Sequence, residues 1–179
     1  FLPTVPGISN FLEMNVRTYV HDAHGNPGVW FYSLDANQGL AVTLARKLFH
    51  LPYFRASMSA EKSEEGISYH CRRKERPQEG SEFLYRGGDM LESPSPVSLE
   101  YFLLERYLLF SYDETKKRLL SGQVYHTPYP AQEAEVTTYS TTAFCQAGFD
   151  VGDSSPVHAA FSPGVSVKVF GIKPVAPQL

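Results

Sequence analysis

Hydrophobic and polar residues alternate over short segments in most of this chain, which is the pattern of strands that bury one face. The alternation is clearest near the C-terminus, where Val165, Val167 and Val169 share one face and Ser166 and Lys168 share the other. The same pattern, bounded by turn residues, predicts strands over residues 13–20, 29–34, 53–59, 66–74, 82–85, 106–112, 118–126, 133–139, 157–161 and 165–170.

A four-residue spacing interrupts this alternation after the second predicted strand. Leu40, Leu44 and Leu48 recur at every fourth position and predict a helix that ends near residues 50–52, with the leucine stripe packed on the sheet. Asp35, followed three residues later by Gln38, resembles the capping box that begins such a helix.

Two shorter helical segments are predicted further along the chain. Ser95 as the cap and Pro96 in the first turn favour a short helix that runs through residues 99–103. A third short helical turn is predicted over residues 142–147. Strands therefore outnumber helices.

The connections between strands point to the fold class. The 13 Gly and 13 Pro residues are scattered at short intervals, so most strands are joined by turns and not by helical crossovers. This favours an α+β, β-rich fold: a strongly curved, mainly antiparallel sheet or partial barrel with two or three short helices. At 179 residues the chain is long enough for one domain with its own core, over residues 1–179.

Charge and hydropathy exclude two classes of partner. The formal net charge of -3 provides no basic excess for binding the phosphate backbone, so we expect no nucleic acid. No stretch approaches the roughly 20 apolar residues of a membrane helix, so we expect a soluble domain that does not enter a membrane. With no basic and apolar leader visible, the cytoplasm is the default compartment, although a cleaved leader would leave no trace.

Motifs for cofactors, metals and nucleophiles are missing. The sequence has no Gly-x-Ser-x-Gly, no phosphate loop and no Gly-x-Gly-x-x-Gly motif, so we expect no cofactor. The six histidines lack the spacing of a metal site, and Cys71 and Cys145 fit two reduced thiols better than one bridge. The pair Lys116 and Lys117 follows acidic residues between two predicted strands and fits an exposed turn.

Five residues remain as candidates for binding or chemistry. Arg17 alternates with apolar residues on the first strand; the pattern alone favours a surface position, but inside a cavity its guanidinium would suit a carboxylate. Tyr53 and Arg55 open a strand after a helix and could line the mouth of a curved sheet, or could be a core aromatic and an exposed arginine. Glu105 and His126 are candidate acids or bases. The alternative for Glu105 is a structural ion pair with Arg106, and the alternative for His126 is that it only ends a strand.

Six segments together resemble a known family. They are residues 13–20 (EMNVRTYV), 28–36 (GVWFYSLDA), 51–53 (LPY), 102–107 (FLLERY), 124–130 (VYHTPYP) and 161–165 (FSPGV). The chain resembles, over essentially its whole length, the bacterial YqjF-like family, which is uncharacterised and known as domain of unknown function 2071. Members usually carry a further segment before the point where this chain begins, so we expect the family's N-terminal segment to be lacking.

The resemblance implies the fold of the acetoacetate decarboxylase-like superfamily, in which a curved sheet surrounds an interior cavity. In the decarboxylase an early arginine faces the substrate carboxylate, and a lysine of an adjacent pair forms a Schiff base. Arg17 looks like the counterpart of that arginine, which favours the cavity position. Where the family pattern would place both lysines, this chain has Tyr53 and Phe54, which cannot form an imine.

We therefore expect a cytoplasmic small-molecule-binding domain whose interior cavity takes a small carboxylic acid, bound by Arg17, Tyr53 and Arg55. The alternative is a lyase or hydrolase of small keto or unsaturated acids that uses no imine, with His126, Glu105 or Tyr53 as the catalytic candidates. A third alternative is a structural or interaction domain whose cavity is filled by its own side chains. Whether the chain forms homo-oligomers stays open.

Overall fold

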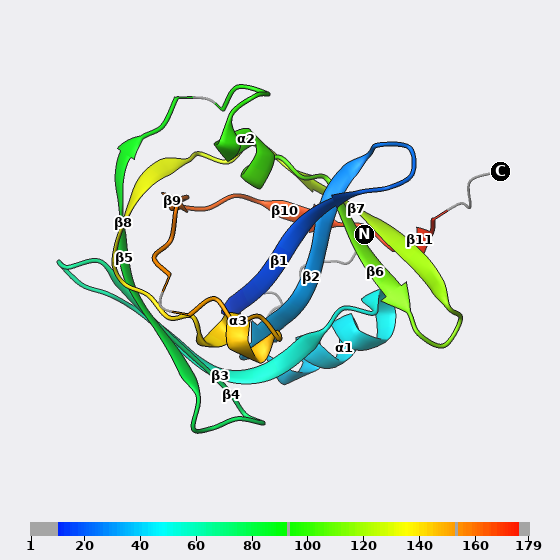
Figure 1. The fold of residues 1–179 in the computed structure, drawn as a ribbon, viewed down its shortest axis with the longest axis horizontal. Coiled ribbons are helices and arrows are strands. Elements are labelled where there is room, and N and C mark those ends of the chain that lie inside the picture. Colours follow the sequence, from blue (N-terminus) through cyan, green and yellow to red (C-terminus); the bar gives the residue numbers. More distant parts are fainter. Residues whose placement is uncertain (1–10, 93, 153, 176–179) are drawn as a thin grey trace.

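One mixed sheet makes up most of the molecule, and Figure 1 shows it as a strongly curved ring of strands that does not close. The computed structural model describes residues 11–92, 94–152 and 154–175. The strands are β1 (Glu13–His21), β2 (Pro27–Ala36), β3 (Tyr53–Lys62), β4 (Ile67–Arg73), β5 (Gly80–Met90), β6 (Leu108–Asp113), β7 (Arg118–His126), β8 (Gln132–Thr138), β9 (Ala160–Phe161), β10 (Val167–Val169) and β11 (Lys173–Pro174). The helices are α1 (Gly39–Phe49), α2 (Leu99–Leu104) and α3 (Thr142–Gln146).

The pairing of the strands confirms the mainly antiparallel sheet that the sequence predicts. Neighbours follow the order β10-β7-β6-β2-β3-β4-β5-β8-β9, with β1 added to β2 and β11 to β7. Two pairings are parallel, those of β2 with β3 and with β6. The predicted strand over residues 157–161 is shorter in the structure, where only Ala160 and Phe161 pair with β8.

The sheet divides at β2, and we call this division the fork. One edge of β2 pairs along its whole length with β1. On the other edge, residues 34–36 pair with β3, whereas Val29 and Trp30 pair with β6. Residues 31–33 lie between these two pairings and have no partner in either register, so β3 and β6 diverge from the middle of β2.

A β-bulge lies at the same place. Val16 of β1 is opposite Ser33, but the next residue, Arg17, is opposite Phe31, so Tyr32 is an extra residue in β2. The extra residue reverses the alternation of β2 and bends the strand. As a result Phe31 and Leu34, which are separated by an odd number of positions, lie on the same face.

The hydrophobic core lies on that face. Its buried members are Val29, Leu34, Leu51 and Leu109, which come from β2, the segment between α1 and β3, and β6. Partly buried side chains that pack against them are Tyr19, Phe31, Phe49, Tyr53, Val124, Val169 and Ile172. The core therefore joins the two branches of the fork through side chains.

The first helix is where the sequence predicts it, but its orientation and its cap differ from the prediction. Leu40, Leu44 and Leu48 are 51%, 40% and 52% exposed, whereas Val42 is 1% exposed and faces the sheet. Both faces of α1 carry apolar residues, so the periodicity could not identify the buried one. Gln38 is the cap, because its side-chain oxygen accepts from the backbone N–H of Ala41 at 2.9 Å. The helix packs on the sheet as predicted, but through Val42 and not through the leucine stripe.

The other two helices are short. Ser98, and not Ser95, caps α2 by accepting the backbone N–H of Tyr101 at 3.2 Å. The third helix, α3, matches the predicted turn closely. No helix in the described part of the chain is both long and apolar enough to cross a bilayer.

Candidate functional site

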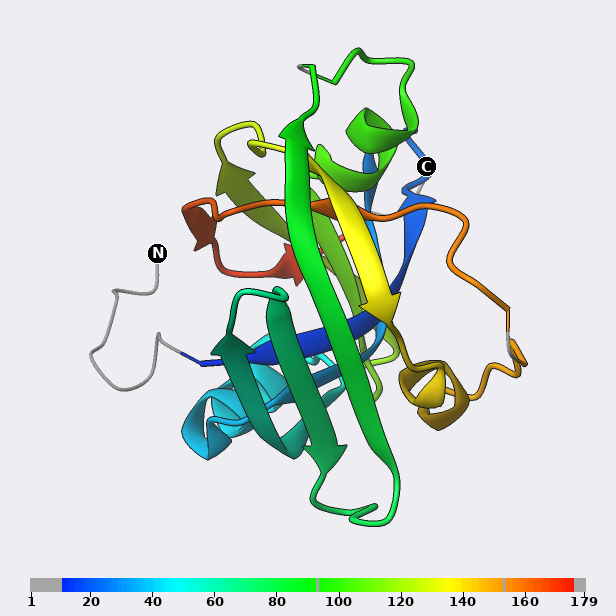
Figure 2. The same cartoon turned by 90° about the vertical axis from the view of Figure 1, so that its left-hand side faces the viewer.

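The first strand carries a line of polar side chains over the hydrophobic core. Glu13, Asn15 and Arg17, which we call the β1 row, are opposite Ala36, Leu34 and Phe31 and share their face of the sheet. Figure 1 shows β1 inside the curve of the sheet, with β5 and β8 on the far side of the ring, and in Figure 2 β1 passes behind β4 and β5. Polar groups above an apolar floor are the arrangement that small-molecule sites use.

At one end of the β1 row, Glu13 forms a hydrogen-bonded pair with Tyr53. The Tyr53 hydroxyl donates to Glu13 Oε2 at 2.6 Å, and the Tyr69 hydroxyl donates to the Glu13 backbone carbonyl at 2.8 Å. Burial raises the pKa of Glu13 above its usual range, and the hydrogen bonds from Tyr53 and Asn15 oppose that rise. Burial and the nearby Glu13 charge also raise the pKa of the Tyr53 phenol. The pair can therefore hold and donate a proton beside the core.

At the other end of the row, Arg17 is exposed but lies inside the curve of the sheet. Its Nη2 donates to the Leu103 carbonyl at the end of α2 at 3.3 Å. Burial raises the pKa of both Glu13 and Tyr129, and the positive charge of Arg17 opposes both rises, so Arg17 lies within electrostatic reach of the two groups. The remaining N–H groups of the guanidinium are suited to a carboxylate.

Glu105 is buried and contacts two tyrosines, of which Tyr107 is exposed and Tyr129 is partly buried. Its side chain is 7% exposed and accepts hydrogen bonds from the Tyr107 hydroxyl and, at 3.4 Å, from the Tyr129 backbone N–H. The hydrogen bond to Glu105 raises the pKa of Tyr107 to about 12. Arg106 does not pair with the Glu105 carboxylate; its Nη1 donates to the Glu105 backbone carbonyl at 2.8 Å.

His126 lies next to Tyr107 and is 4% exposed. Its ring stacks on Tyr107 with centroids 4.5 Å apart. Its Nδ1 is 2.8 Å from the Thr127 carbonyl and its Nε2 is 3.3 Å from the Arg106 carbonyl. Both ring nitrogens face backbone carbonyls, which only accept hydrogen bonds, so a neutral ring donates from one nitrogen to one of the two carbonyls. In this arrangement His126 holds the end of β7 against the segment of Arg106 and Tyr107.

The structure thus brings some of the predicted residues together and separates one. Arg17 is linked to Tyr53 through Glu13, and Glu105 and His126 lie near its other side. Arg55 lies apart, because its Nη2 is 3.5 Å from Thr43 Oγ1 on α1. Glu13 was missed by the sequence reasoning. The available signal was its alternation with Arg17, which places both on one face of the strand.

A second buried carboxylate, Asp35, forms an ion pair that the sequence did not indicate. Arg73 Nε and Nη2 donate to its two oxygens at 2.6 and 3.2 Å. The Arg73 side chain is 4% exposed and the Asp35 side chain is 1% exposed. The Arg73 guanidinium also lies 4.0 Å from the ring centroid of Phe54. Burial raises the pKa of Asp35, and the hydrogen bonds and charge of Arg73 oppose that rise. This pair joins β2 to β4, and Arg73 Nη1 also donates to the Gln146 carbonyl at 3.4 Å.

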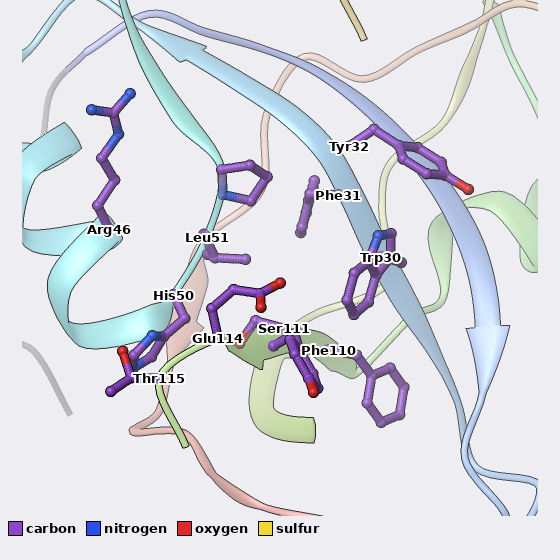
Figure 3. Close-up of a pocket in the computed structure, with 12 residues that line it drawn as sticks. Trp30, Phe31, Tyr32, Arg46, His50, Leu51, Phe110, Ser111, Glu114 and Thr115 are labelled. Atoms are coloured by element: carbon purple, nitrogen blue, oxygen red, sulfur yellow. The ribbon is translucent and has the colours of Figure 1, made fainter. Parts of the chain in front are cut away.

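The fork contains an open cleft of about 480 Å³, which we call the fork cleft. Aromatic side chains of β2 and β6, among them Trp30, Phe31 and Phe110, form much of its wall, and the end of α1 and the turn after β6 complete it (Figure 3). None of the five residues predicted from the sequence lines this cleft. Within the described residues, no group of three or more His, Cys, Asp or Glu side chains could hold a metal ion.

The predicted lysine turn is confirmed. Lys116 and Lys117 lie in the turn between β6 and β7, and the Lys117 ammonium pairs with Glu114 at 2.9 Å. The Lys117 side chain is 72% exposed. Both cysteines are free, Cys71 buried and Cys145 exposed. Burial raises the pKa of the Cys71 thiol to about 12.

Comparison with known proteins gives a family match and a fold match. The model of the DUF2071 family, described as an uncharacterised conserved protein, matches residues 1–166. The uncharacterised protein YqjF of Bacillus subtilis (strain 168) is 38% identical over 157 residues, which are 88% of this chain and 64% of that protein. This chain thus spans 64% of the length of that relative.

Two solved structures of acetoacetate decarboxylase share the fold. The enzyme from Legionella pneumophila has a TM-score of 0.56 and 14% identity, with 96% of this chain and 69% of that chain covered. Another acetoacetate decarboxylase structure has a TM-score of 0.54 and 9% identity, with 92% of this chain and 68% of that chain covered. At these identities the likeness shows the β-rich fold alone.

Proposed function

This chain belongs to the DUF2071 family of uncharacterised conserved proteins, and we propose that it binds a small organic acid through Arg17. The observation that carries the proposal is the Arg17 guanidinium itself. It is exposed on the face of β1 that Phe31 and Leu34 share, and among the described residues the Leu103 carbonyl is its one hydrogen-bond acceptor. A carboxylate could therefore take the remaining donors without displacing a protein ion pair.

The neighbours of Arg17 indicate what else the acid should carry. Phe31 and Leu34 supply an apolar floor on the same face, which favours a hydrocarbon portion. Glu13 lies along the same row, and its raised pKa favours the protonated form that can donate to a carbonyl or hydroxyl oxygen. A short keto or hydroxy acid fits both features.

The compartment is part of the same proposal. Cys71 and Cys145 are both free thiols. Reducing compartments preserve free thiols, which supports the cytoplasm as the site of action.

The pair of Glu13 and Tyr53 favours a second candidate function. A carboxyl with a raised pKa, 2.6 Å from a phenol, is suited to general acid catalysis on the acid bound at Arg17. The reaction would be that of a lyase or hydrolase acting on a small keto or unsaturated acid. It would use no imine, because Tyr53 and Phe54 replace the lysines and Lys116 and Lys117 lie in a solvated turn.

Thermal unfolding in the presence of small acids tests the binding function. We expect at least one member of a panel of carboxylic, keto and aromatic acids to raise the Tm of the wild type, because a ligand specific to the folded state stabilises it by about 2.7 kcal/mol at a hundred times Kd. Arg17→Ala should remove the shift. Arg86→Ala is the matched control, since Arg86 is also an exposed sheet arginine but pairs with Glu135.

Two outcomes would contradict the binding function: an equal shift in Arg17→Ala, or no shift with any acid. Turnover separates the two candidates once an acid is found. If the protein is an enzyme, Glu13→Gln should abolish product formation while the Tm shift remains. A binding domain should show the shift with no product from the wild type.

A further inference from the structure

The fork cleft contains no residue of the β1 row, although it shares Phe31 with the apolar floor opposite Arg17, and it has a different chemical character. It exists because β3 and β6 leave β2 on either side of residues 31–33, and the bulge at Tyr32 bends the strand there. Its volume of about 480 Å³ is within the usual range for small-molecule sites. Bulges are often found beside binding sites, where they redirect a side chain.

Aromatic rings dominate the wall of the cleft. Trp30, Phe31 and Tyr32 come from β2, and Phe110 and Tyr112 come from β6. Figure 3 shows the indole of Trp30 between Tyr32 and Phe110. The faces of aromatic rings attract cations, and the indole ring does so most strongly.

The charged groups around the cleft favour a cation as well. Figure 3 shows the Glu114 carboxylate turned toward Phe31 and Leu51, whereas the Arg46 guanidinium points away from them. Arg46 Nε instead donates to the Tyr53 carbonyl at 2.5 Å. His50 Nε2 lies 3.9 Å from the buried carboxylate of Asp113. Glu114, whose carboxylate also pairs with the exposed Lys117 ammonium at 2.9 Å, is therefore the charged group that is turned into the cleft.

Two further groups can accept hydrogen bonds at this place. The cleft borders the C-terminal end of α1, where the last carbonyl groups carry partial negative charge. Ser111, which lines the cleft, has a buried hydroxyl with no hydrogen-bond partner among the described residues. A buried hydroxyl without a partner costs free energy that a donating ligand could recover.

From these observations we propose that the fork cleft binds a small organic ammonium ion with an aromatic or apolar portion. The ammonium group lies between Glu114 and the end of α1, and the apolar portion packs on Trp30 and Phe110. This site does not depend on Arg17 or on the proposed binding of acids, and its partner has the opposite charge.

Intrinsic fluorescence reports directly on this site, because Trp30 is the one tryptophan of the chain. The probes are phenethylammonium, phenylpropionate and 2-phenylethanol, which share a phenyl group and differ in charge. We expect a saturable change in tryptophan emission with phenethylammonium, a weaker response with the alcohol and none with the carboxylate. A carboxylate that binds as well as the ammonium ion, or no response to any probe, would overturn the proposal.

Variants in the exposed turn identify the charged partner without disturbing the core. Glu114→Gln should weaken binding of phenethylammonium by no more than about fivefold, as expected for a charge pair to an exposed carboxylate. Lys117→Asn should tighten it, because the competing ammonium is lost and asparagine tolerates the left-handed backbone at this position. Glu135→Gln, on the distant β8, is the matched control and should change nothing. An unchanged Kd in both turn variants would refute the role of Glu114.

The Arg17→Ala variant separates this proposal from the proposed function. It should bind phenethylammonium like the wild type even though its response to acids is lost. If Arg17→Ala loses both responses, the two ligands share one site and the fork cleft is not independent.

Discussion

Two carboxyl groups lie at neighbouring pairs of the same two strands and have different partners. Glu13 is opposite Ala36, and Asp35 is opposite Met14, so the two side chains lie on opposite faces of the sheet. Burial raises the pKa of both. Asp35 is matched by the permanent charge of Arg73, whereas Glu13 is matched by the neutral phenol of Tyr53.

The partner decides what each carboxyl group can do. Arg73 cannot lose its proton, so the pair with Asp35 stays charged and serves to hold β2 against β4. Tyr53 stabilises Glu13 by one hydrogen bond and leaves it free to change its protonation state. A carboxyl group whose pKa is raised by burial is therefore part of a structural ion pair on one face and a group suited to proton transfer on the other.

The largest effect should come from removing the charged partner. Arg73→Met leaves Asp35 buried without a counter-charge, and we expect a loss of about 3–5 kcal/mol in the free energy of unfolding. Urea denaturation measures it. Arg72→Met is the matched control, because Arg72 is the exposed neighbour on the same strand and should change stability by less than about 0.5 kcal/mol.

If Arg73→Met does not accumulate as folded protein, the double variant Asp35→Leu with Arg73→Met should recover stability by removing both charges. A single variant as stable as Arg72→Met would show that the ion pair is not needed to hold the two strands.

Removing the neutral partner should cost less. Tyr53→Phe deletes the hydroxyl that donates to Glu13, and we expect a loss of about 1–2 kcal/mol by urea denaturation, the cost of one buried acceptor left without its donor. Tyr125→Phe is the control, since Tyr125 is 55% exposed and should be neutral. A loss as large as that of Arg73→Met would mean that Glu13 is held as rigidly as Asp35.

The pH dependence of stability should distinguish Glu13 by a still smaller effect. Because its folded pKa is raised, the folded state binds the proton more tightly than the unfolded state. Its contribution to stability is therefore present below the unfolded pKa and is lost as pH rises through the folded pKa. The stability of the wild type relative to Glu13→Gln should therefore increase as the pH is lowered from neutral to acid. Identical pH profiles of the two proteins would contradict the raised pKa.

No effect at all is expected in a test for an imine. Borohydride added with a keto acid should leave the mass of the protein unchanged, because Tyr53 and Phe54 cannot form an imine and Lys117 lies exposed in the turn between β6 and β7. Intact-protein mass spectrometry measures this. A stable adduct mapped to Lys116 or Lys117 would show that the turn can reach a bound acid and would reopen chemistry by a Schiff base.

Local sequence patterns predicted much of the fold. Alternation placed β1, β3, β4 and β7 within a few residues, because each strand buries one face and turns bound it. The fork was not predictable, since it depends on which strands pair with β2 at residues far away in the sequence. The bulge at Tyr32 leaves one signal in the sequence: the core residues Phe31 and Leu34 are three positions apart and not two. A single break in alternation is also typical of a strand end, so this signal does not identify a bulge.

The candidate site was predicted in part. Arg17 stood out through its alternation with apolar residues and through the family resemblance. Glu13 did not, because a glutamate at the start of a strand usually faces water, and its burial depends on Tyr53, forty positions away. Asp35 was misread as a helix cap for the same reason: Arg73, its partner, is thirty-eight positions away.

The fork also has a consequence for motion. β2 joins β3 over three register pairs and β6 over two, whereas β3 joins β4 over seven and β6 joins β7 over six. The connection along β2, which we call the seam, is thus narrower than the two parts of the sheet that it joins. These parts, the β3–β4 hairpin and the β6–β7 hairpin, are the two lobes. Local opening should begin where the fewest hydrogen bonds must break, so amide hydrogen exchange should be faster at this seam than within either lobe. A ligand bound in the fork cleft would then slow this local opening and lower the exchange rate at the seam.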